Sequence, residues 1–271
     1  MEPKFYREGI GLDSAAYKNI WLVPSSLDEL NRRIHDGVPV ERLAERAAER
    51  RDLCFETLFP YARPGDGARV LELGPGVGWI MEAMLARYPI CEIVGLDVSP
   101  VMVEAAQQRW SDPRANYLVY DGLRAPLDDD SFDNVYSVAC LQHIEKHHAF
   151  LILQELVRLM RPGGHATLHL LSIHHLPIAR QAFDQECWKR VNNANTHWMH
   201  YYSYDEIVVL FSYGLGVTDL DVKFWGTSFW VHFSKGTDRP FHHKHVQRES
   251  FLHRGVPETI RPRGGRLPLQ K

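Results

Sequence analysis

The segment LELGPGVGW, residues 71–79, holds the residues whose types and spacing point most clearly to chemistry. Apolar residues predict a buried strand, Arg69–Leu73, and the apolar spacing that follows predicts a helix beginning at about Trp79. A strand, a glycine turn and a helix in this order direct backbone N–H groups at a nucleotide-sized ligand. Glycine is needed there because the backbone must turn sharply and admit the ligand without a Cβ in the way.

Acidic residues stand near the ends of the predicted strands. Glu72 lies two positions before the first glycine of the turn. Asp97 follows the predicted strand Glu92–Leu96, and Asp121 comes directly after the predicted strand Asn116–Tyr120. In a parallel sheet the ligand site lies beyond the carboxyl ends of the strands. Asp97 is therefore placed to hold a ribose, since a carboxylate has only acceptors to offer to two hydroxyl groups.

The glycine spacing narrows the identity of the ligand. Gly74, Gly76 and Gly78 read G-x-G-x-G, whereas a dinucleotide fingerprint has its third glycine one position later. Together with Glu72, this pattern resembles the first motif of the class I S-adenosylmethionine-dependent methyltransferases. The resemblance continues to about Leu171, with the further runs DG, PLDDDSFDNVYS, LQHIE and LVRLMRPGG in the family's order and spacing.

The resemblance implies an α/β fold: a Rossmann-like, mostly parallel, seven-stranded sheet with helices on both faces and a terminal antiparallel hairpin. The runs Val217–Phe224 and Ser228–Ser234 alternate as such a hairpin would. Residues 1–66 are predicted to form a helical N-terminal cap, and residues 67–235 the S-adenosylmethionine-binding domain with a substrate insert at 172–214. Residues 236–271 are basic and lack apolar periodicity, which predicts a mobile tail.

The resemblance also implies roles for single residues. Asp97 would hold the ribose, Met102 would pack on the adenine face, and Asp121 would accept from the adenine amino group. Glu72 would lie near the methionyl ammonium. The cofactor-binding residues expected in this way are Glu72, Gly74, Gly76, Asp97, Val98, Met102, Asp121, Gly122 and Ala139.

His143 is the candidate general base. Methyl transfer is an in-line displacement at a sulfonium, and an acceptor hydroxyl must lose its proton on the way. His143 follows the predicted fourth strand, which ends near Val138, so it hangs over the reacting groups and has a usable pKa range. The alternative is a histidine that anchors the loop by hydrogen bonds. Glu145 either orients His143 or caps the next helix.

The acceptor is sought in the insert. Its aromatic and polar side chains suit a carbohydrate, because rings stack on sugar C–H faces while polar tips meet hydroxyl groups. The opposite interpretation is a hydrophobic hinge between two helices. In this respect the chain resembles bacterial sugar O-methyltransferases, including those of actinobacterial polysaccharides, and O-methylation of a sugar or glycoside is the leading expectation. The substrate-binding residues expected are His174, Trp198, His200, Tyr201 and Tyr202.

Three alternatives stay open. A lipid, a quinone or an aromatic natural product would be the acceptor if Leu and Phe line the pocket instead of His, Asn and Tyr. A nicotinamide oxidoreductase is disfavoured by the glycine spacing and by Asp121-Gly122. A cofactor-binding protein without turnover would keep the same motifs.

Composition sets further bounds. A net charge of −3 argues against a nucleic-acid partner, and no apolar run is long enough for a membrane span. Four widely spaced cysteines and the lack of a signal-peptide core favour the cytoplasm. Magnesium is not favoured as a cofactor, because Ala139 and Cys140 stand where metal-dependent members of the catechol type carry an acidic pair. The sequence does not decide between a monomer and a homo-oligomer.

Overall fold

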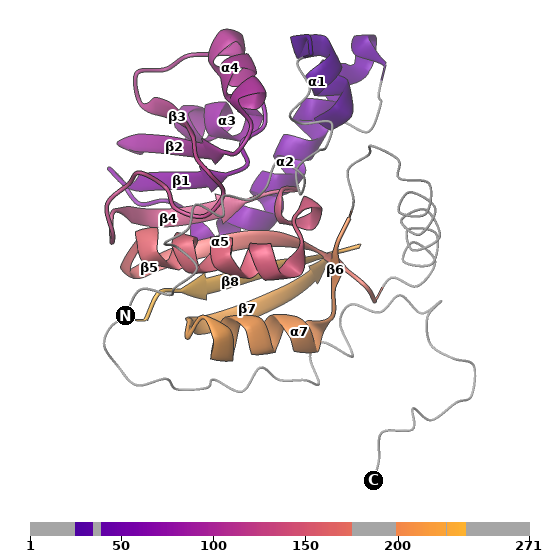
Figure 1. Ribbon diagram of the computed structural model, residues 1–271. Helices are drawn as coiled ribbons and strands as arrows, with labels where there is room; N and C mark the ends of the chain where they lie inside the picture. The colour runs from indigo at the N-terminus through magenta and orange to yellow at the C-terminus, as the bar shows by residue number, and fades with distance from the viewer. Residues whose placement is uncertain (1–24, 35–38, 175–198, 226, 237–271) are drawn as a thin grey trace, which may run out of the picture.

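A twisted, mostly parallel sheet forms the centre of the protein (Figure 1). The computed structural model describes residues 25–34, 39–174, 199–225 and 227–236. Its strand order is β3-β2-β1-β4-β5-β8-β7, and the short strand β6 pairs with β5 off this path. The strands are β1 (Arg69–Leu73), β2 (Glu92–Asp97), β3 (Ala115–Val119), β4 (Phe132–Ser137), β5 (Met160–Ser172), β6 (Tyr201–Tyr202), β7 (Thr218–Trp225) and β8 (Ser228–Ser234).

Pairing directions confirm the predicted architecture. The neighbours among β1 to β5 run parallel, while β8 is antiparallel to both β5 and β7. The seven strands of the main path and the terminal hairpin match the expectation, and β6 adds a two-residue strand that was not predicted. The parallel order places the ends of β1, β2, β4 and β5 at one edge of the sheet, where the site is expected.

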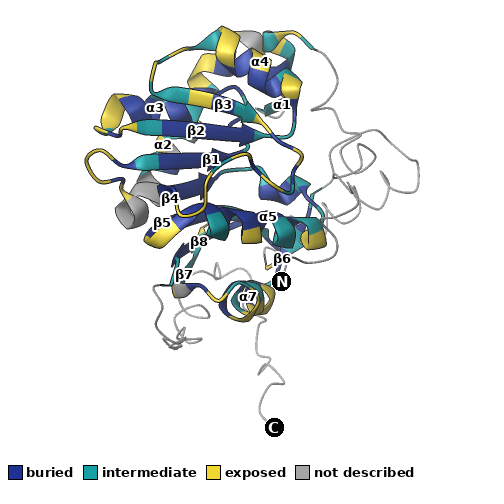
Figure 2. Cartoon of the chain, turned by 60° about the vertical axis from the view of Figure 1, so that its left-hand side comes forward, coloured by how far each residue is buried: buried dark blue, intermediate teal, exposed yellow. Residues whose placement is uncertain are grey.

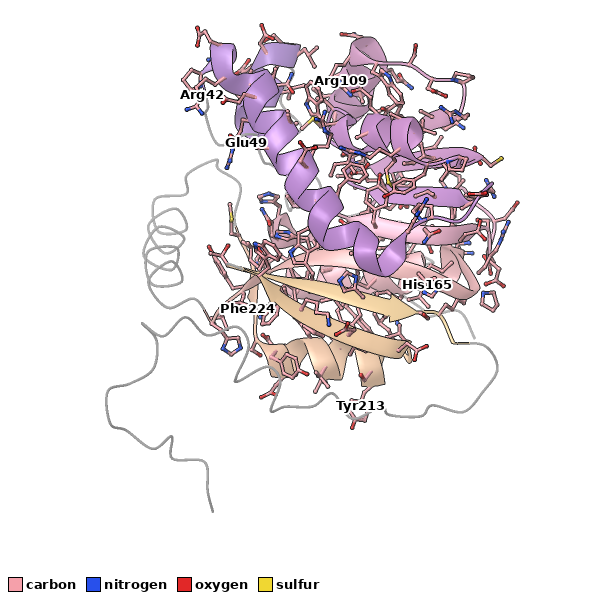
Figure 3. The ribbon with its side chains drawn as sticks, turned by 180° about the vertical axis from the view of Figure 1, so that it is seen from behind. Arg42, Glu49, Arg109, His165, Tyr213 and Phe224 are labelled. Carbon is pink, nitrogen blue, oxygen red and sulfur yellow. The ribbon has the colours of Figure 1, made fainter. Side chains whose placement is uncertain are left out.

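Helices cover both faces of the sheet (Figures 1 and 2). Figure 3 shows α2 crossing one face from behind. The Ser99 side chain accepts from the Met102 N–H at the start of α4, and Ser203 and Glu206 form the predicted capping box of α7. The helices are α1 (Leu27–Ile34), η2 (Val40–Arg42), α2 (Leu43–Ala62), α3 (Trp79–Arg87), α4 (Pro100–Arg109), η3 (Leu141–His143), α5 (Lys146–Leu159), α7 (Tyr204–Val208) and η4 (Val209–Gly214).

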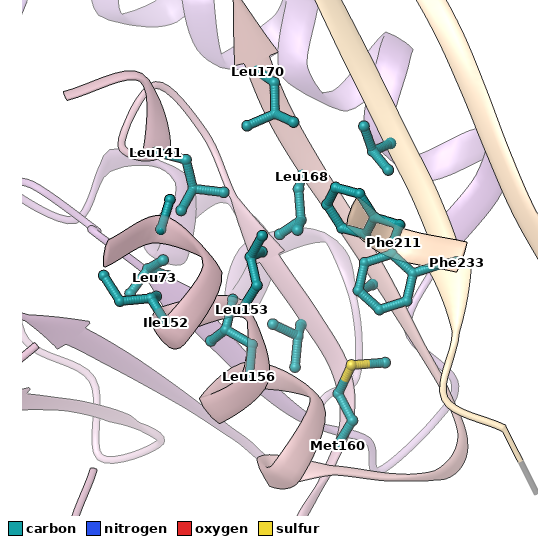
Figure 4. Packing of buried hydrophobic residues seen from close by; sticks show 14 of the residues in the cluster. Leu73, Leu141, Ile152, Leu153, Leu156, Met160, Leu168, Leu170, Phe211 and Phe233 are labelled. Carbon is teal, nitrogen blue, oxygen red and sulfur yellow. The ribbon is translucent and has the colours of Figure 1, made fainter. Parts of the chain in front are cut away.

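The hydrophobic core consists of clusters on the two faces of the sheet, because successive side chains of a strand point to opposite faces. Leu71 and Leu73 of β1 join α5 in a large cluster (Figure 4), whereas Val70 packs in a second cluster with Met81 and Met84 of α3. Successive strand residues point to opposite faces, so a strand covered on both sides must be apolar throughout. Glu72 is the exception in β1: it is only 2% exposed. Burying a carboxyl group is unfavourable unless it has hydrogen-bond partners, so Glu72 is a candidate functional residue.

Two predicted boundaries were wrong. The sequence predicts a helix at Phe150–Met160 and a strand at His165–Leu171, but the helix is Lys146–Leu159 and the strand is Met160–Ser172. The run Arg161-Pro-Gly-Gly was interpreted as a break between them. A register shift in the pairing of β4 with β5 carries these residues within the strand instead, with Gly163 at φ 79°. The predicted helix at Pro177–Val191 and the tail at 237–271 lie outside the described residues.

Within the described part of the chain, no helix combines the length and the apolar character that a membrane crossing needs.

Candidate functional site

The turn after β1 is built from glycines in the left-handed region. Gly74, Gly76 and Gly78 have φ values of 69°, 56° and 81°, which side chains other than glycine rarely adopt. A Cβ at Gly74 would lie 2.4 Å from Cys140 Sγ, and one at Gly78 would lie 2.3 Å from Tyr117 Oη. Glycine is therefore required at these two positions by the protein's own packing as well as by its backbone conformation.

Two carboxyl groups stand beside this turn. Asp97, at the end of β2, accepts a hydrogen bond from the Ser99 N–H at 2.9 Å, and burial raises its pKa to about 6. Glu72 accepts from Tyr136 Oη at 2.8 Å. Burial, reinforced by the nearby Asp97 charge, raises the pKa of Glu72 to about 8. Glu72 therefore keeps its proton to a higher pH than Asp97 does.

Both carboxyl groups face one cavity of about 620 Å³, a volume in the usual range for small-molecule and cofactor sites. One side of the cavity is the β1–β2 wall, defined here as Glu72, Gly74, Gly76 and Asp97. The other side is the β5–β8 wall, defined as His169, Leu171, Ser228 and Trp230. Of the residues predicted from sequence, the cavity brings together Glu72, Gly74, Gly76, Asp97, Val98, Met102, Ala139 and His143.

The segment after β4 lies between the two walls. Ala139 has a φ of 55°, and its N–H donates to His169 Nδ1 at 3.3 Å. His169 Nε2 lies 2.7 Å from Ser228 Oγ. His169 thus ties together the ends of β4, β5 and β8, and the strain at Ala139 is held by this contact. From the sequence, His169 was placed near this end of the sheet with a structural role favoured, and Ser228 was assigned no role.

His143 lies in η3, is half-buried and lines the cavity, as predicted. Its Nε2 is 3.3 Å from the side-chain nitrogen of Gln142, which is only 8% exposed. Glu145 is the N-cap residue of α5, and its carboxylate lies 3.8 Å from His200 Nε2. The position of His143 satisfies the first requirement of a general base, which is access to the cavity.

Comparisons with known proteins agree with this geometry. The profile of a family described as "Methyltransferase domain" matches residues 70–164, the stretch from β1 to the start of β5. The chain is similar to a ubiquinone/menaquinone biosynthesis C-methyltransferase of Desulfotalea psychrophila, with 29% identity over 47% of this chain and 56% of that protein. It is also similar to a malonyl-[acyl-carrier protein] O-methyltransferase of Erwinia pyrifoliae, with 32% identity over 51% and 50%.

Residues 70–164 therefore form a methyltransferase domain. A solved S-adenosylmethionine-dependent methyltransferase from Methanosarcina mazei shares its fold, with a TM-score of 0.53 and 18% identity over 64% of this chain and 95% of that one. S-adenosylmethionine is the cofactor of this class. The chain spans about half the length of the curated relatives it matches.

Two residues expected near the adenine stand apart from the cavity of the methyltransferase domain. Asp121 is exposed, and its Oδ1 accepts from the N–H groups of Leu123 and Arg124, both at 2.8 Å. Neither Asp121 nor Gly122 lines the cavity, whereas the preceding Tyr120 does. The carboxylate therefore stabilises its own turn, and its contact with adenine stays a prediction.

The described insert residues that were predicted to bind substrate do not line the cavity either. His174 is exposed, and its Nε2 accepts from the Tyr204 N–H at 3.2 Å. His200 is buried, and its N–H donates to the Gln142 carbonyl at 2.7 Å. Tyr201 and Tyr202 form β6, and Tyr202 is 2% exposed within the large core cluster. Met199 lines the cavity instead, and Trp198 lies outside the described residues.

Pairing with β5 explains this placement. Tyr201 and Tyr202 align with Leu171 and Ser172, so Tyr202 enters the core, where the Lys146 ammonium lies 5.0 Å from the ring centroid. Tyr202 therefore packs in the core, and the substrate roles expected for the insert residues stay predictions. Among the described residues, no group of three or more histidine, cysteine, aspartate or glutamate side chains is arranged to hold a metal ion.

Proposed function

We propose that this protein transfers a methyl group from S-adenosylmethionine to a small, largely apolar acceptor. The observation that carries the proposal is a single cavity that contains the β1–β2 wall, the β5–β8 wall and His143. A cofactor held at the first wall and an acceptor held at the second would meet at the segment around Ala139. Placing two reactants in one enclosed site is the main requirement for a displacement reaction.

The residues of the β1–β2 wall fit the cofactor. Asp97 would accept from the ribose hydroxyls, Met102 would pack on the adenine, and the turn at Gly74 would face the methionyl end. The cofactor supplies an electrophilic methyl group on a positively charged sulfur. Glu72 is suited to a cationic ligand, because a nearby positive charge would favour its ionised form and offset the burial that raises its pKa to about 8.

The acceptor side supports an apolar substrate over the sugar expected from the sequence. Val138, Ile144, Leu171, Met199 and Trp230 line the cavity there, and the described tyrosines of the insert do not. Two relatives are named for ubiquinone/menaquinone biosynthesis and for malonyl-[acyl-carrier protein], and neither name refers to a sugar. O-methylation and C-methylation both remain compatible with this wall.

His143 would take the proton that the acceptor loses. Both a hydroxyl oxygen and an acidic carbon must shed a proton when they gain a methyl group, and the half-buried imidazole beside the cavity is placed to receive it. The Gln142 side chain, 3.3 Å from His143 Nε2, would hold the ring in place.

The test is transfer of labelled methyl from S-adenosylmethionine into separated cell fractions, with magnesium and with chelator. Label should enter the neutral-lipid and quinone fraction, and the His143→Ala protein should transfer much less of it. Label in the oligosaccharide fraction would restore the sugar acceptor, and loss of transfer with chelator would bring in a metal. No transfer into any fraction, with nicotinamide cofactor binding in place of S-adenosylhomocysteine, would overturn the proposal.

A further inference from the structure

The pairing of β5 with β8 brings four side chains to one surface of the cavity. His169 stands opposite Trp230, and Leu171 stands opposite Ser228. Residues two apart on a strand point to the same face, so these four side chains form a continuous patch. All four line the cavity, whereas the residues between them pack in the core on the opposite face. Ser228 and His169 are the polar members of this patch.

The hydrogen bonds of His169 fix where its proton lies. The Ala139 N–H can only donate, so His169 Nδ1 is the acceptor in their 3.3 Å contact. In a neutral imidazole the other nitrogen then carries the proton. His169 Nε2–H therefore donates to Ser228 Oγ at 2.7 Å, and Ser228 keeps its own hydroxyl proton for another partner.

That hydroxyl proton stands in apolar surroundings. Ser228 is 8% exposed, and its strand neighbours Leu171 and Trp230 line the cavity with apolar side chains. A buried donor without a partner is unfavourable, so a ligand that offers an acceptor oxygen binds better than one that offers only carbon. Because His169 Nε2 already carries a proton, the Ser228 hydroxyl cannot donate to it and is left to donate elsewhere.

We infer that the His169–Ser228 pair selects a methyl acceptor that carries a carbonyl or phenolate oxygen, to which the Ser228 hydroxyl donates. This inference rests on the proposed function. When such an acceptor loses its proton to His143, the negative charge spreads onto that oxygen. The nucleophilic atom then forms its bond to the methyl group as the sulfur–methyl bond breaks, and S-adenosylhomocysteine leaves. A donor at the oxygen stabilises the anion and holds the nucleophile in position.

The test uses two probes that differ in one oxygen, α-tetralone and its deoxygenated counterpart tetralin, binding to the protein saturated with S-adenosylhomocysteine. The wild-type complex should bind α-tetralone more tightly than tetralin. Ser228→Ala should weaken α-tetralone binding roughly threefold to tenfold and leave tetralin unchanged, as expected for one neutral hydrogen bond. Ser228→Thr, which keeps the hydroxyl, should restore the preference, and His169→Phe should lower it.

Ser234→Ala is the matched control. His165 Nδ1 and Ser234 Oγ form a similar pair at 2.9 Å on the same two strands, outside the cavity lining. Phe229, the residue after Ser228, pairs with Phe224 of β7. Figure 3 shows His165 and Phe224 at opposite ends of these strands, so the control pair lies far from Ser228. This variant should bind both probes as the wild type does.

Equal affinity of the wild-type complex for both probes, or no binding of either, would overturn the inference, as would an equal loss of both probes in Ser228→Ala. S-adenosylhomocysteine affinity is measured on the same samples by calorimetry. A wild-type protein that does not bind S-adenosylhomocysteine would contradict the proposed function itself. A wild-type protein that binds S-adenosylhomocysteine but shows no preference for α-tetralone would contradict only the role of Ser228.

Discussion

The two walls of the cavity are constructed differently. The β1–β2 wall comes from two short stretches in which the functional residues lie close to a glycine turn and a strand end. The β5–β8 wall joins His169 to Ser228, which are 59 positions apart. The first wall is specified by local sequence, so a motif can represent it. The second wall exists only because two strands pair in one register, so it can change with the acceptor while the cofactor site stays constant.

His143 is the residue between the walls, and its replacement has the largest expected effect. His143→Ala should lower turnover roughly 100-fold or more, in keeping with general-base catalysis, while S-adenosylhomocysteine affinity stays near that of the wild type. Single-turnover kinetics and calorimetry on the same protein separate the two quantities. Unchanged turnover would leave His143 as a loop anchor, which was the alternative from the sequence.

The glycine turn is expected to tolerate substitution least. Gly78→Ala combines a φ of 81° with a Cβ only 2.3 Å from Tyr117 Oη, so it should destabilise the fold by about 2–3 kcal/mol. Gly67→Ala is the matched control, because its φ is 70° but no atom lies within 4 Å of the added Cβ. That variant should lose about 1 kcal/mol. Equal losses in urea unfolding would show that the Tyr117 contact has no effect.

Asp97 tests the β1–β2 wall directly. Asp97→Ala should weaken S-adenosylmethionine binding roughly 30-fold, or about 2 kcal/mol, because hydrogen bonds to a charged acceptor are lost. The fold should survive, since Asp97 lies at the end of its strand. Asp128→Ala, which removes an exposed carboxylate before β4, serves as the control. Affinity near that of the wild type would contradict the ribose assignment.

The sequence predicted the features that local residues encode, as they do in the β1–β2 wall. The order of β1 to β5, the glycine turn and the terminal hairpin were predicted because strand alternation and turn residues are local signals. The cavity positions of Asp97 and His143 were predicted from the strands that precede them, whereas that of Met102 came from the resemblance to the methyltransferase family.

The acceptor side could not be predicted in this way. Tyr202 and His200 seemed suited to a ligand by residue type, but pairing of β6 with β5 places Tyr202 in the core, and His200 is buried with its backbone N–H on the Gln142 carbonyl. His169 was given only a structural role and Ser228 none, because a histidine or a serine in a strand has no local signature of function. Only the register of β5 with β8 brings the two side chains within 2.7 Å.

The smallest expected effect concerns Glu72, whose folded-state pKa of about 8 lies above its ordinary value of 4.5. Between these values the folded protein holds a proton that the unfolded chain has released, so this group makes stability fall as pH rises through that window. From pH 6 to pH 7 the loss should be about 1 kcal/mol for the cofactor-free protein.

Glu72→Gln removes this titration while keeping a group that can bond to Tyr136 Oη. The free energy of unfolding of this variant should therefore fall less than that of the wild type between pH 6 and pH 7. Asp97, whose pKa is raised to about 6, acts in the same direction in both proteins and largely cancels in the difference. Parallel pH profiles in urea unfolding would show that Glu72 is already ionised at pH 6. The carboxyl would then need a permanent cationic partner, and the β1–β2 wall would be polar before the cofactor binds.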